Sequence, residues 1–436
     1  MQTIIDIPIL KIVDAIDQAA RLFLNPDHSL RKEAESALAQ SSSKEMAQFV
    51  LDDCFSQLTS RSLIQLLEEE LGDPLILDMF RPKRHGRGWS RAYGPRMITH
   101  ILPGNVPCVS IISLVCALLV KSESIAKISE KVLAGDVRPA GGVPPSSSLP
   151  ALFVRGLQSV NEMLAQSITL TSWGHEQTLL TAEAFHRAEL VILYGSDQTI
   201  ETLRPYIPRE TRVIVHGPKV SLGIVAREAI ARQVAQDAAW DIALYDQCGC
   251  LSPHLYYVEE SGADAPIVFA QWVAEALETI PLPKGIVSPS AGSAIQQLRG
   301  TIPLKGRDAD LGGAVFASKE GVDWTVLYDP DPAFSYSPLS RTVFIKPIKT
   351  LSDVGVYLEP IIPHLQAVGV AVSDNFIWGS KSEALLNQLG LLGVCRICPI
   401  GKMQKPPLTW HHDGRFRILD LLRFLDWEGD QRTAKI

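Results

Sequence analysis

The chain has 436 residues, of which 46% are hydrophobic and 20% are charged, an ordinary composition for a globular protein. At roughly 100–200 residues per domain, this length predicts two or three domains, each large enough to bury a core without disulfide bonds. The net charge of −7 and the lack of like-charge runs argue against a nucleic-acid partner.

The first part of the chain has the pattern of helices. The opening residues, MQTIIDIPILKIVDAIDQAA, place no basic segment before an apolar run, so we predict no signal peptide. Apolar side chains recur at spacings of three and four from Ile9 to Phe23, which indicates an amphipathic helix. DHSLRKEAESALAQ and SRSLIQLLEEELG continue this pattern, and the second stretch ends at a glycine suited to a helix stop.

Two stretches after the helices differ in character. Residues 81–96, RPKRHGRGWSRAYGPR, are basic and rich in glycine, and we expect an exposed connector whose charge is either solvated or attracts an anionic substrate. The longest apolar run, CVSIISLVCALLV at residues 108–120, is shorter than the roughly 20 residues that cross a bilayer. We therefore predict a buried helix there and no transmembrane segment.

From residue 97 onward, short β-branched runs alternate with longer amphipathic stretches. RMITHILPGNVP, ESIAKIS, AELVILYGS and TRVIVHG contain candidate strands, which predicts an α/β domain with a mostly parallel sheet. A second series follows in SPHLYYVEES, APIVFAQWVAEALETI, WTVLYDPD, RTVFIKPI and QAVGVAVSD, so we expect a second α/β unit. The last 26 residues predict one amphipathic helix.

The cysteines do not have the pattern of a disulfide framework or a zinc site. Seven cysteines are an odd number scattered over a long chain, which favours a reducing cytoplasm. Structural zinc takes four ligands, usually in paired knuckles. Cys395 and Cys398 have the spacing of one knuckle and are followed by His411 and His412, but Cys248 and Cys250 are separated by one residue and the set as a whole matches no knuckle pair. We predict no metal site, and we expect Cys395 and Cys398 to pack in a core because GVCRICPIG has the pattern of a strand.

YDQCGCLSPH, residues 245–254, allows two interpretations. Cys248 and Cys250 are either small buried hydrophobic side chains, or one of them is a nucleophile. The preceding EAIARQVAQDAAWDIALY predicts a helix, so both cysteines fall in the turn after it, where Gly249 permits an unusual torsion or a close approach to a ligand. A thiol is partly ionised near neutral pH, which makes a cysteine on a rigid turn a candidate for covalent catalysis.

Several stretches from about Tyr93 to the C-terminus resemble, in order, segments of the aldehyde dehydrogenase superfamily. LPGNVP resembles its Pro-x-Asn-x-Pro turn, IAKISE its ribose-binding strand, and LYGS a strand-to-helix turn of its cofactor domain. YDQCGCLSPH, HGPKVSLGIV and WHHDGR are similar to its acyl-CoA reductase branch, which includes the reductase subunit of the bacterial bioluminescence fatty-acid reductase complex. The resemblance implies an aldehyde-dehydrogenase-like α/β fold, with a Rossmann-like cofactor domain and an α/β catalytic domain.

The resemblance also implies residue roles. Cys250, counted back from the shared strand HLYYVEE, takes the place of the catalytic cysteine, and Cys248 becomes a neighbour that we expect to pack. Asn105 takes the place of the amide that donates a hydrogen bond to the oxyanion. The residues implied at the nicotinamide cofactor are Lys127, Ser129, Glu130, Gly195 and Ser196.

Two departures from the superfamily pattern stand out. Aldehyde-oxidising members carry a glutamate just before the glycine of the segment similar to VIVHGPK, whereas this chain has Val215 and His216 there. Without that carboxylate, water should attack an acyl-enzyme slowly, which favours reduction of acyl thioesters over oxidation of aldehydes. The role of His216, as acid, base or structural residue, stays open. The Glu-x-Phe motif that grips the nicotinamide ribose is missing around residues 337–344.

The expected function is therefore NAD(P)H-dependent reduction of a fatty acyl thioester, on CoA or on a protein, to the aldehyde through an acyl-cysteine. Lys127 suits the 2′-phosphate of NADPH, and Glu130 would favour NADH. Expected partners are the acyl thioester, an acyl-supplying enzyme and further copies of the chain. The alternatives are an aldehyde dehydrogenase working in the oxidising direction and a non-catalytic assembly subunit.

This interpretation divides the chain into four parts. Residues 1–80 form a helical N-terminal segment, and residues 81–219 form the nicotinamide-cofactor-binding domain. Residues 220–395 form the catalytic domain with the cysteine nucleophile, and residues 396–436 pack back on the core.

Overall fold

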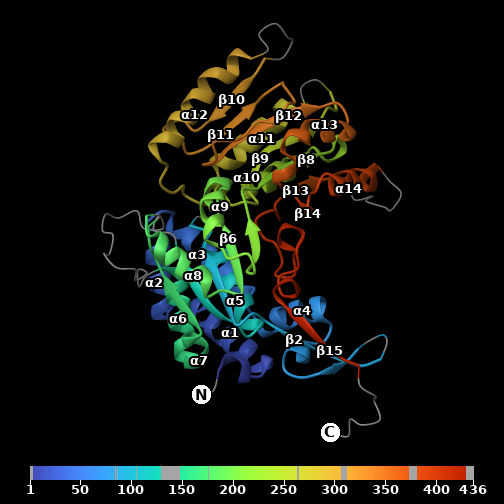
Figure 1. Cartoon of the computed structure of the whole chain (residues 1–436). Coiled ribbons are helices and arrows are strands. Elements are labelled where there is room, and N and C mark those ends of the chain that lie inside the picture. Colours follow the sequence, from blue (N-terminus) through green and yellow to red (C-terminus); the bar gives the residue numbers. More distant parts are fainter. Residues whose placement is uncertain are drawn as a thin grey trace. The chain divides into compact units, whose positions relative to one another are not determined.

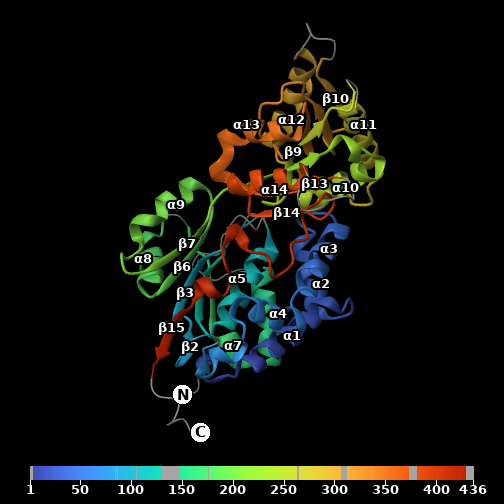
Figure 2. The same cartoon turned by 90° about the vertical axis from the view of Figure 1, so that its right-hand side faces the viewer.

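The computed structural model describes residues 3–83, 85, 87–104, 106–128, 148–174, 176–262, 265–305, 312–372 and 381–428. Contacts within the chain define two compact units, whose elements are labelled in Figure 1 and seen from a second side in Figure 2. Unit 1 consists of residues 1–40, 47–217 and 407–436, and unit 2 of residues 41–46 and 218–406.

The N-terminal helices form as the sequence predicts. They are α1 (Ile9–Leu24), α2 (Ser29–Leu38), α3 (Lys44–Ser56) and α4 (Ser60–Leu71). The apolar stripe of α1 is buried, and Phe23 at its end stacks on Phe55 with ring centroids 4.2 Å apart. Thr59 caps the start of α4, and the predicted stop is Gly72, which has a φ of 76°. Apart from the first three residues of α3, these helices belong to unit 1, where α1 packs against α5 (Pro107–Leu119) and α6 (Leu149–Val160).

A five-stranded parallel sheet forms the centre of unit 1. Its order is β5-β4-β3-β6-β7, with β3 (Met97–Ile101), β4 (Glu123–Lys127), β5 (Ile168–Thr171), β6 (Leu190–Tyr194) and β7 (Arg212–His216). The chain starts at the middle strand, winds outward to β5, and then returns to β6 and β7, which is a doubly wound, Rossmann-like order. The remaining helices of this part are α7 (Glu162–Gln166), α8 (Thr178–His186) and α9 (Asp197–Leu203).

The apolar run at residues 108–120 is helix α5, and most of its side chains are buried, as expected. In the part of the chain that the structure describes, no helix combines the length and the apolar character needed to cross a membrane.

Two predictions about unit 1 are wrong. Residues 81–96 are not simply a connector, because they contain β1 (Arg81–Pro82) and β2 (Trp89–Tyr93), and the end of the chain forms β15 (Arg423–Trp427) instead of a helix. These strands make an antiparallel sheet in which Tyr93 faces Arg423 and Trp89 faces Trp427. Pairing with a strand about 330 positions earlier overrides the local helical periodicity. Arg91 and Arg423 lie over the Tyr93 ring, which accounts for part of the basic character.

Unit 2 contains the predicted second α/β arrangement. Its seven-stranded sheet has the order β10-β11-β12-β9-β8-β13-β14, and only β10 runs antiparallel to its neighbour. The strands are β8 (Val220–Val225), β9 (Pro253–Glu259), β10 (Ala314–Ala317), β11 (Thr325–Tyr328), β12 (Thr342–Ile348), β13 (Leu365–Ala371) and β14 (Arg396–Pro399).

Helices cover both faces of this sheet. Helices α10 (Arg232–Ala243) and α11 (Ala265–Glu278) pack on one face, where Tyr256 and Val258 of β9 are buried. Helices α12 (Pro289–Thr301), α13 (Val354–Leu358) and α14 (Lys381–Leu391) contribute to the other, where Leu255 and Tyr257 are buried. Because the central strands are buried on both sides, they are near-continuous apolar runs, which explains why the sequence revealed them.

Candidate functional site

Cys250 lies in the turn between α10 and β9, as predicted. The short 3-10 helix η6 (Leu244–Gln247) precedes it, and Tyr245, Asp246 and Gln247 have φ angles of 56°, 49° and 64°. A left-handed conformation costs roughly 1–2 kcal/mol for a non-glycine residue, so three in succession must be imposed by their surroundings. The sequence suggested an unusual backbone torsion at Gly249. In the structure the left-handed torsions instead fall on the residues from Tyr245 to Gln247.

The backbone of this turn is fixed on both sides of Cys250. Ser221 of β8 donates its hydroxyl to the carbonyl oxygen of Cys250 at 2.9 Å. The amide of Gly249 donates to the Ser252 hydroxyl at 3.2 Å, and that hydroxyl also accepts from the Gln404 amide at 2.5 Å. These hydrogen bonds fix the backbone that carries the thiol. Cys250 itself is half-buried, so the residue keeps part of its surface exposed.

Gln247 ties the turn to two strands. Its fully buried carboxamide donates from Nε2 to the carbonyls of Pro253 at 2.8 Å and Thr342 at 2.7 Å. Its Oε1 accepts from the Thr342 amide at 2.7 Å. One side chain therefore joins the residue before the cysteines to the first residues of β9 and β12.

A second left-handed turn lies against the first one. Leu339, Ser340 and Arg341 have φ angles of 64°, 53° and 55°. Arg341 donates from Nε to Asp246 at 2.8 Å, and Lys284 donates to the Ser340 carbonyl at 2.8 Å. Burial lowers the pKa of Lys284 to about 8. The two turns are thus held together by buried charge-assisted hydrogen bonds, which are stronger than neutral ones.

The cysteines differ from expectation in two respects. Cys248 is exposed, so the packing role expected for it is wrong. The sulfur of Cys248 lies 3.5 Å from the Asp246 carbonyl, within the left-handed turn. Cys398 of β14 and Cys395, which directly precedes this strand, are half-buried rather than sealed in a core, and none of the seven cysteines forms a disulfide bond.

Three of the predicted cofactor residues, Lys127, Gly195 and Ser196, lie at the ends of parallel strands of unit 1. Lys127 is the last residue of β4, and its Nζ lies 5.8 Å from the centroid of the Trp173 ring. Gly195 and Ser196 follow β6, and the Ser196 hydroxyl caps α9 by accepting from the Thr199 amide at 3.3 Å. Because the carboxyl ends of parallel strands meet at one edge, the structure brings Lys127, Gly195 and Ser196 to the same edge of the sheet.

This edge is where open α/β sheets bind nucleotides. Lys127 and the turn at Gly195 and Ser196 lie at this edge on either side of β3, and a lysine and a strand-to-helix turn are groups that can bind phosphate. Three other predicted site residues, Asn105, Ser129 and Glu130, lie outside the described residues.

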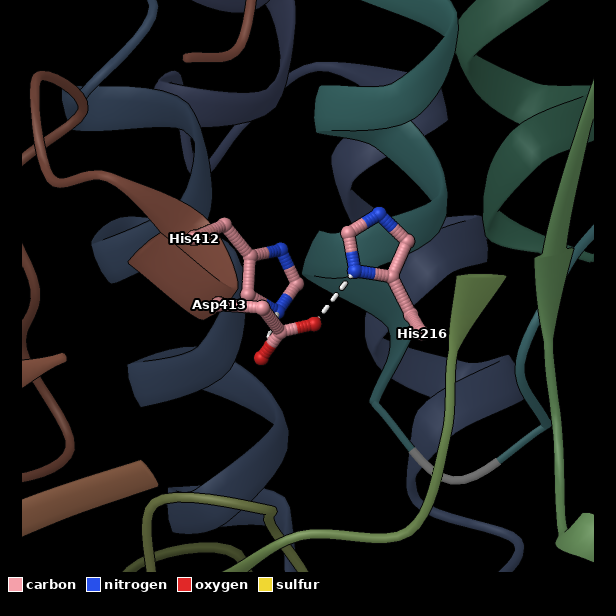
Figure 3. A group of neighbouring side chains, drawn as sticks. All are labelled: His216, His412 and Asp413. Atoms are coloured by element: carbon pink, nitrogen blue, oxygen red, sulfur yellow. Dashed lines mark hydrogen bonds and ion pairs between the residues drawn. The ribbon is translucent and has the colours of Figure 1, made fainter. Parts of the chain in front are cut away.

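At the same edge His216 meets two residues from the far end of the chain (Figure 3). His216 ends β7, whereas His412 and Asp413 belong to the 3-10 helix η10 (His412–Gly414). The Nδ1 of His216 lies 2.6 Å from Oδ2 of Asp413, and the two side chains are 12% and 7% exposed. The His216 ring stacks against the rings of Tyr194 and His412, with centroids 4.5 Å from each, and the centroids of those two rings are 6.4 Å apart.

Sequence reasoning assigned no role to Gln247, Arg341 or Asp413. Gln247 and the WHHDGR segment appear in motifs that resemble the reductase branch, but nothing local in the sequence indicates their partners. Asp413 is 197 residues from His216, and Arg341 is 95 residues from Asp246. These residues are far apart in the sequence and come together only when the chain has folded.

Comparison with solved structures defines the class of protein. The NAD-dependent benzaldehyde dehydrogenase of Corynebacterium glutamicum superposes with a TM-score of 0.70 at 14% identity, covering 98% of this chain and 87% of that one. Together with the doubly wound unit 1 and the seven-stranded unit 2, this establishes the aldehyde dehydrogenase fold that the sequence motifs predicted.

Comparison of sequences assigns the chain to a more specific group than the fold does. The profile of the family described as acyl-CoA reductase (LuxC) matches residues 4–424, and the chain belongs to that family. The long-chain acyl-protein thioester reductase of Aliivibrio fischeri is 25% identical over 391 residues, covering 88% of this chain and 75% of the relative. Long-chain acyl-protein thioester reductase 2 of Photobacterium leiognathi is 26% identical over 391 residues, with the same coverage. The chain is thus an aldehyde-forming acyl reductase, as expected.

Proposed function

We propose that the chain reduces a long-chain fatty acyl thioester to the aldehyde through an acyl-Cys250 intermediate, using NADPH, with NADH as the alternative. The observation that carries this proposal is the anchored turn at Cys250, a half-buried thiol on a backbone held by Ser221 and Ser252. A nucleophile in a fixed position avoids part of the entropic cost of attack. The names of the relatives, which specify long-chain acyl-protein thioesters, support the substrate class.

In the acyl-transfer step the Cys250 thiolate attacks the thioester carbonyl. The bond between that carbon and the carrier sulfur then breaks, and the acyl group stays on Cys250. We assign the Asn105 amide and the Cys250 backbone N–H to the oxyanion, where one such donor is worth about 10²–10³ in rate. A bound nicotinamide supplies the hydride that turns the acyl-cysteine into the aldehyde.

We assign cofactor binding to unit 1 and the nucleophile to unit 2. Lys127, Ser129, Glu130, Gly195 and Ser196 are the proposed cofactor residues. Lys127 would pair with a 2′-phosphate as a point charge, which favours NADPH, whereas a carboxylate such as Glu130 on the ribose would favour NADH. Initial rates with each cofactor at equal concentration distinguish the two.

The same proposal covers location and partners. A catalytic thiol must stay reduced, and seven cysteines without a disulfide bond suit a reducing compartment, so we propose that the enzyme works in the cytoplasm. We also propose that a partner enzyme supplies the acyl group, and that copies of the chain associate as in the wider superfamily.

Acylation without cofactor tests the nucleophile. The parent, Cys250→Ala and Cys248→Ala are each incubated with radiolabelled long-chain acyl-CoA, and protein-bound label is counted. Cys248 is a matched control, because it is an exposed thiol two residues from Cys250. We expect the parent and Cys248→Ala to retain label and Cys250→Ala to retain almost none. Equal labelling of Cys250→Ala and the parent would show that another residue is acylated.

A further inference from the structure

The turn in unit 2 that carries Cys250 also carries a second thiol, that of Cys248. The two cysteines are separated only by Gly249, and the chain bends at this glycine. An extended chain advances at most about 3.6 Å per residue, so the two Cα atoms are no more than about 7 Å apart and come closer at a bend. Disulfide-bonded cysteines usually have Cα atoms about 4.4–6.8 Å apart. The spacing of this pair therefore suits a disulfide bond.

Hydrogen bonds hold the backbone on both sides of the pair. The amide of Cys248 donates to the Tyr245 carbonyl at 2.9 Å, and the Cys250 carbonyl accepts from the Ser221 hydroxyl at 2.9 Å. These contacts use the main chain of the two cysteines and keep both of them in the same ordered turn. The two sulfurs thus stay close together whenever the turn is folded.

The two thiols differ in their chemistry. Cys248 is an exposed residue, whereas Cys250 is half-buried. Desolvation of its sulfur and the negative charge of Asp246 raise the pKa of the Cys248 thiol. A thiol with a raised pKa stays protonated at neutral pH, and the thiolate is the form that attacks thioesters and reacts with peroxides. Cys248 is therefore poorly suited to be acylated or oxidised first, but it is the neighbour of whatever forms on Cys250.

We infer that Cys248 is a resolving cysteine, which captures an oxidised Cys250 in a reversible disulfide bond. The inference rests on the proposed function, in which Cys250 reacts as a thiolate. That thiolate attacks one oxygen of hydrogen peroxide, the O–O bond breaks, and the products are a Cys250 sulfenic acid and hydroxide. The Cys248 sulfur then attacks the Cys250 sulfur and the S–O bond breaks. The thiol proton leaves with the hydroxyl group as water.

Such a disulfide would protect the nucleophile without disabling it for good. It blocks acylation while it exists, and it prevents further oxidation of Cys250 to the irreversible sulfinic acid. The bond closes a ring over the single residue Gly249, whose lack of a side chain permits the torsion that a short ring requires. Strained and exposed disulfides are the ones that thiols reduce readily, so cellular thiols can restore the enzyme.

The experiment treats the full-length enzyme with hydrogen peroxide and divides the sample. One half is alkylated and digested with trypsin without reductant. Cleavage after Arg232 and Lys284 gives one peptide, residues 233–284, in which Cys248 and Cys250 are the only cysteines. Its mass distinguishes a disulfide, which has lost two hydrogen atoms, from a sulfinic or sulfonic acid, which has gained two or three oxygen atoms. The other half is reduced with dithiothreitol and assayed for acylation with radiolabelled long-chain acyl-CoA.

For the parent we expect the disulfide mass and recovery of nearly all acylation. Cys248→Ala should be acylated like the parent before peroxide, but afterwards it should contain the sulfinic or sulfonic acid and recover almost no acylation. Cys398→Ala is the matched control, because it removes another half-buried thiol of unit 2 that lies outside the peptide. It should behave like the parent.

Two results would overturn the inference: a parent peptide without the disulfide, or equal recovery of acylation by Cys248→Ala and the parent. Failure of the proposed function is recognised separately and before any oxidation. In that case untreated Cys250→Ala retains as much acyl label as the parent, whereas the mass of the peptide still reports whether the disulfide forms.

Discussion

At the scale of single residues, the site depends on side chains that hold strained backbone in place. The left-handed residues 245–247 and 339–341 would relax without the buried groups that join them. Gln247 bonds to the backbone of Thr342 and Pro253, and Asp246 accepts from Arg341. The turn that carries Cys250 is therefore specified by residues that need not touch the substrate.

We expect Gln247→Met to lower both stability and acylation. Methionine has a similar size but cannot replace the three hydrogen bonds, so buried backbone groups lose their partners at a net cost of roughly 2–3 kcal/mol in the free energy of unfolding. The acylation rate should fall by about 10²-fold if the thiol moves by about 1 Å. Urea unfolding and the labelling assay measure the two effects.

Gln271→Met on the surface of α11 is the control for this change. The Gln271 side chain donates an exposed hydrogen bond to Glu275, so its loss should change stability by less than about 0.5 kcal/mol. Normal acylation by Gln247→Met would mean that the left-handed turns do not position Cys250.

At the scale of elements, the packing of β8 against β9 depends on a missing side chain. Gly223 of β8 faces the ring of Tyr256, which is fully buried in β9. A Cβ at this glycine would lie 2.0 Å from Cδ1 of Tyr256, which is impossible without displacing the ring. The central strands of unit 2 are thus joined by close contact as well as by hydrogen bonds.

We expect Gly223→Ala to reduce the free energy of unfolding by about 1–3 kcal/mol or more, because the ring has no space to move. Gly292→Ala in α12 is the matched control, because in the described part of the chain no atom outside the adjoining helix backbone lies within 4 Å of the added Cβ. Alanine there should raise stability by about 0.4–1 kcal/mol. Urea unfolding measures both, and equal stability of the two variants would contradict the packing argument.

The elements also show what the sequence could and could not predict. Strands such as 220–225 and 253–259 are buried on both faces, so their continuous apolar runs marked them without any knowledge of their neighbours. Strand β15 has five exposed residues and is stabilised by its pairing with β2. Its local sequence contains no sign of that distant partner, and its periodicity suggested a helix. The same limit applies to the site, where Cys250 and Gly195 follow predicted elements but Asp413 reaches His216 only through the fold.

At the scale of the whole molecule, stability should depend on pH through a buried histidine. His100 in β3 is fully buried, and burial lowers its pKa to about 3. In the described part of the chain its Nε2 has no hydrogen-bond partner. The unfolded chain binds a proton at this histidine below pH about 6.5, whereas the folded chain does not until about pH 3, so stability falls as the pH drops through this window.

Between pH 7 and pH 5 this single histidine should remove about 2 kcal/mol from the free energy of unfolding. We expect His100→Gln to lose that much less stability than the parent over the same range, as measured by urea unfolding at both pH values. Burial also lowers the pKa of His254 to about 4, so the stability of His100→Gln should still depend on pH in part. The exposed His186→Gln should behave like the parent, and an unchanged pH dependence in His100→Gln would refute the assignment.

The strand order of unit 1 has a consequence for synthesis. Unit 1 is assembled from three stretches, and the last of them, residues 407–436, leaves the ribosome after all of unit 2. Helices α1–α4 and the parallel sheet can form early. One edge of β2 stays unpaired until β15 has been synthesised. A chain that stops at residue 406 would carry the complete cysteine turn yet lack the carboxylate that orients His216. Translation of residues 407–436 thus sets when the hydrogen bond between His216 and Asp413 can form.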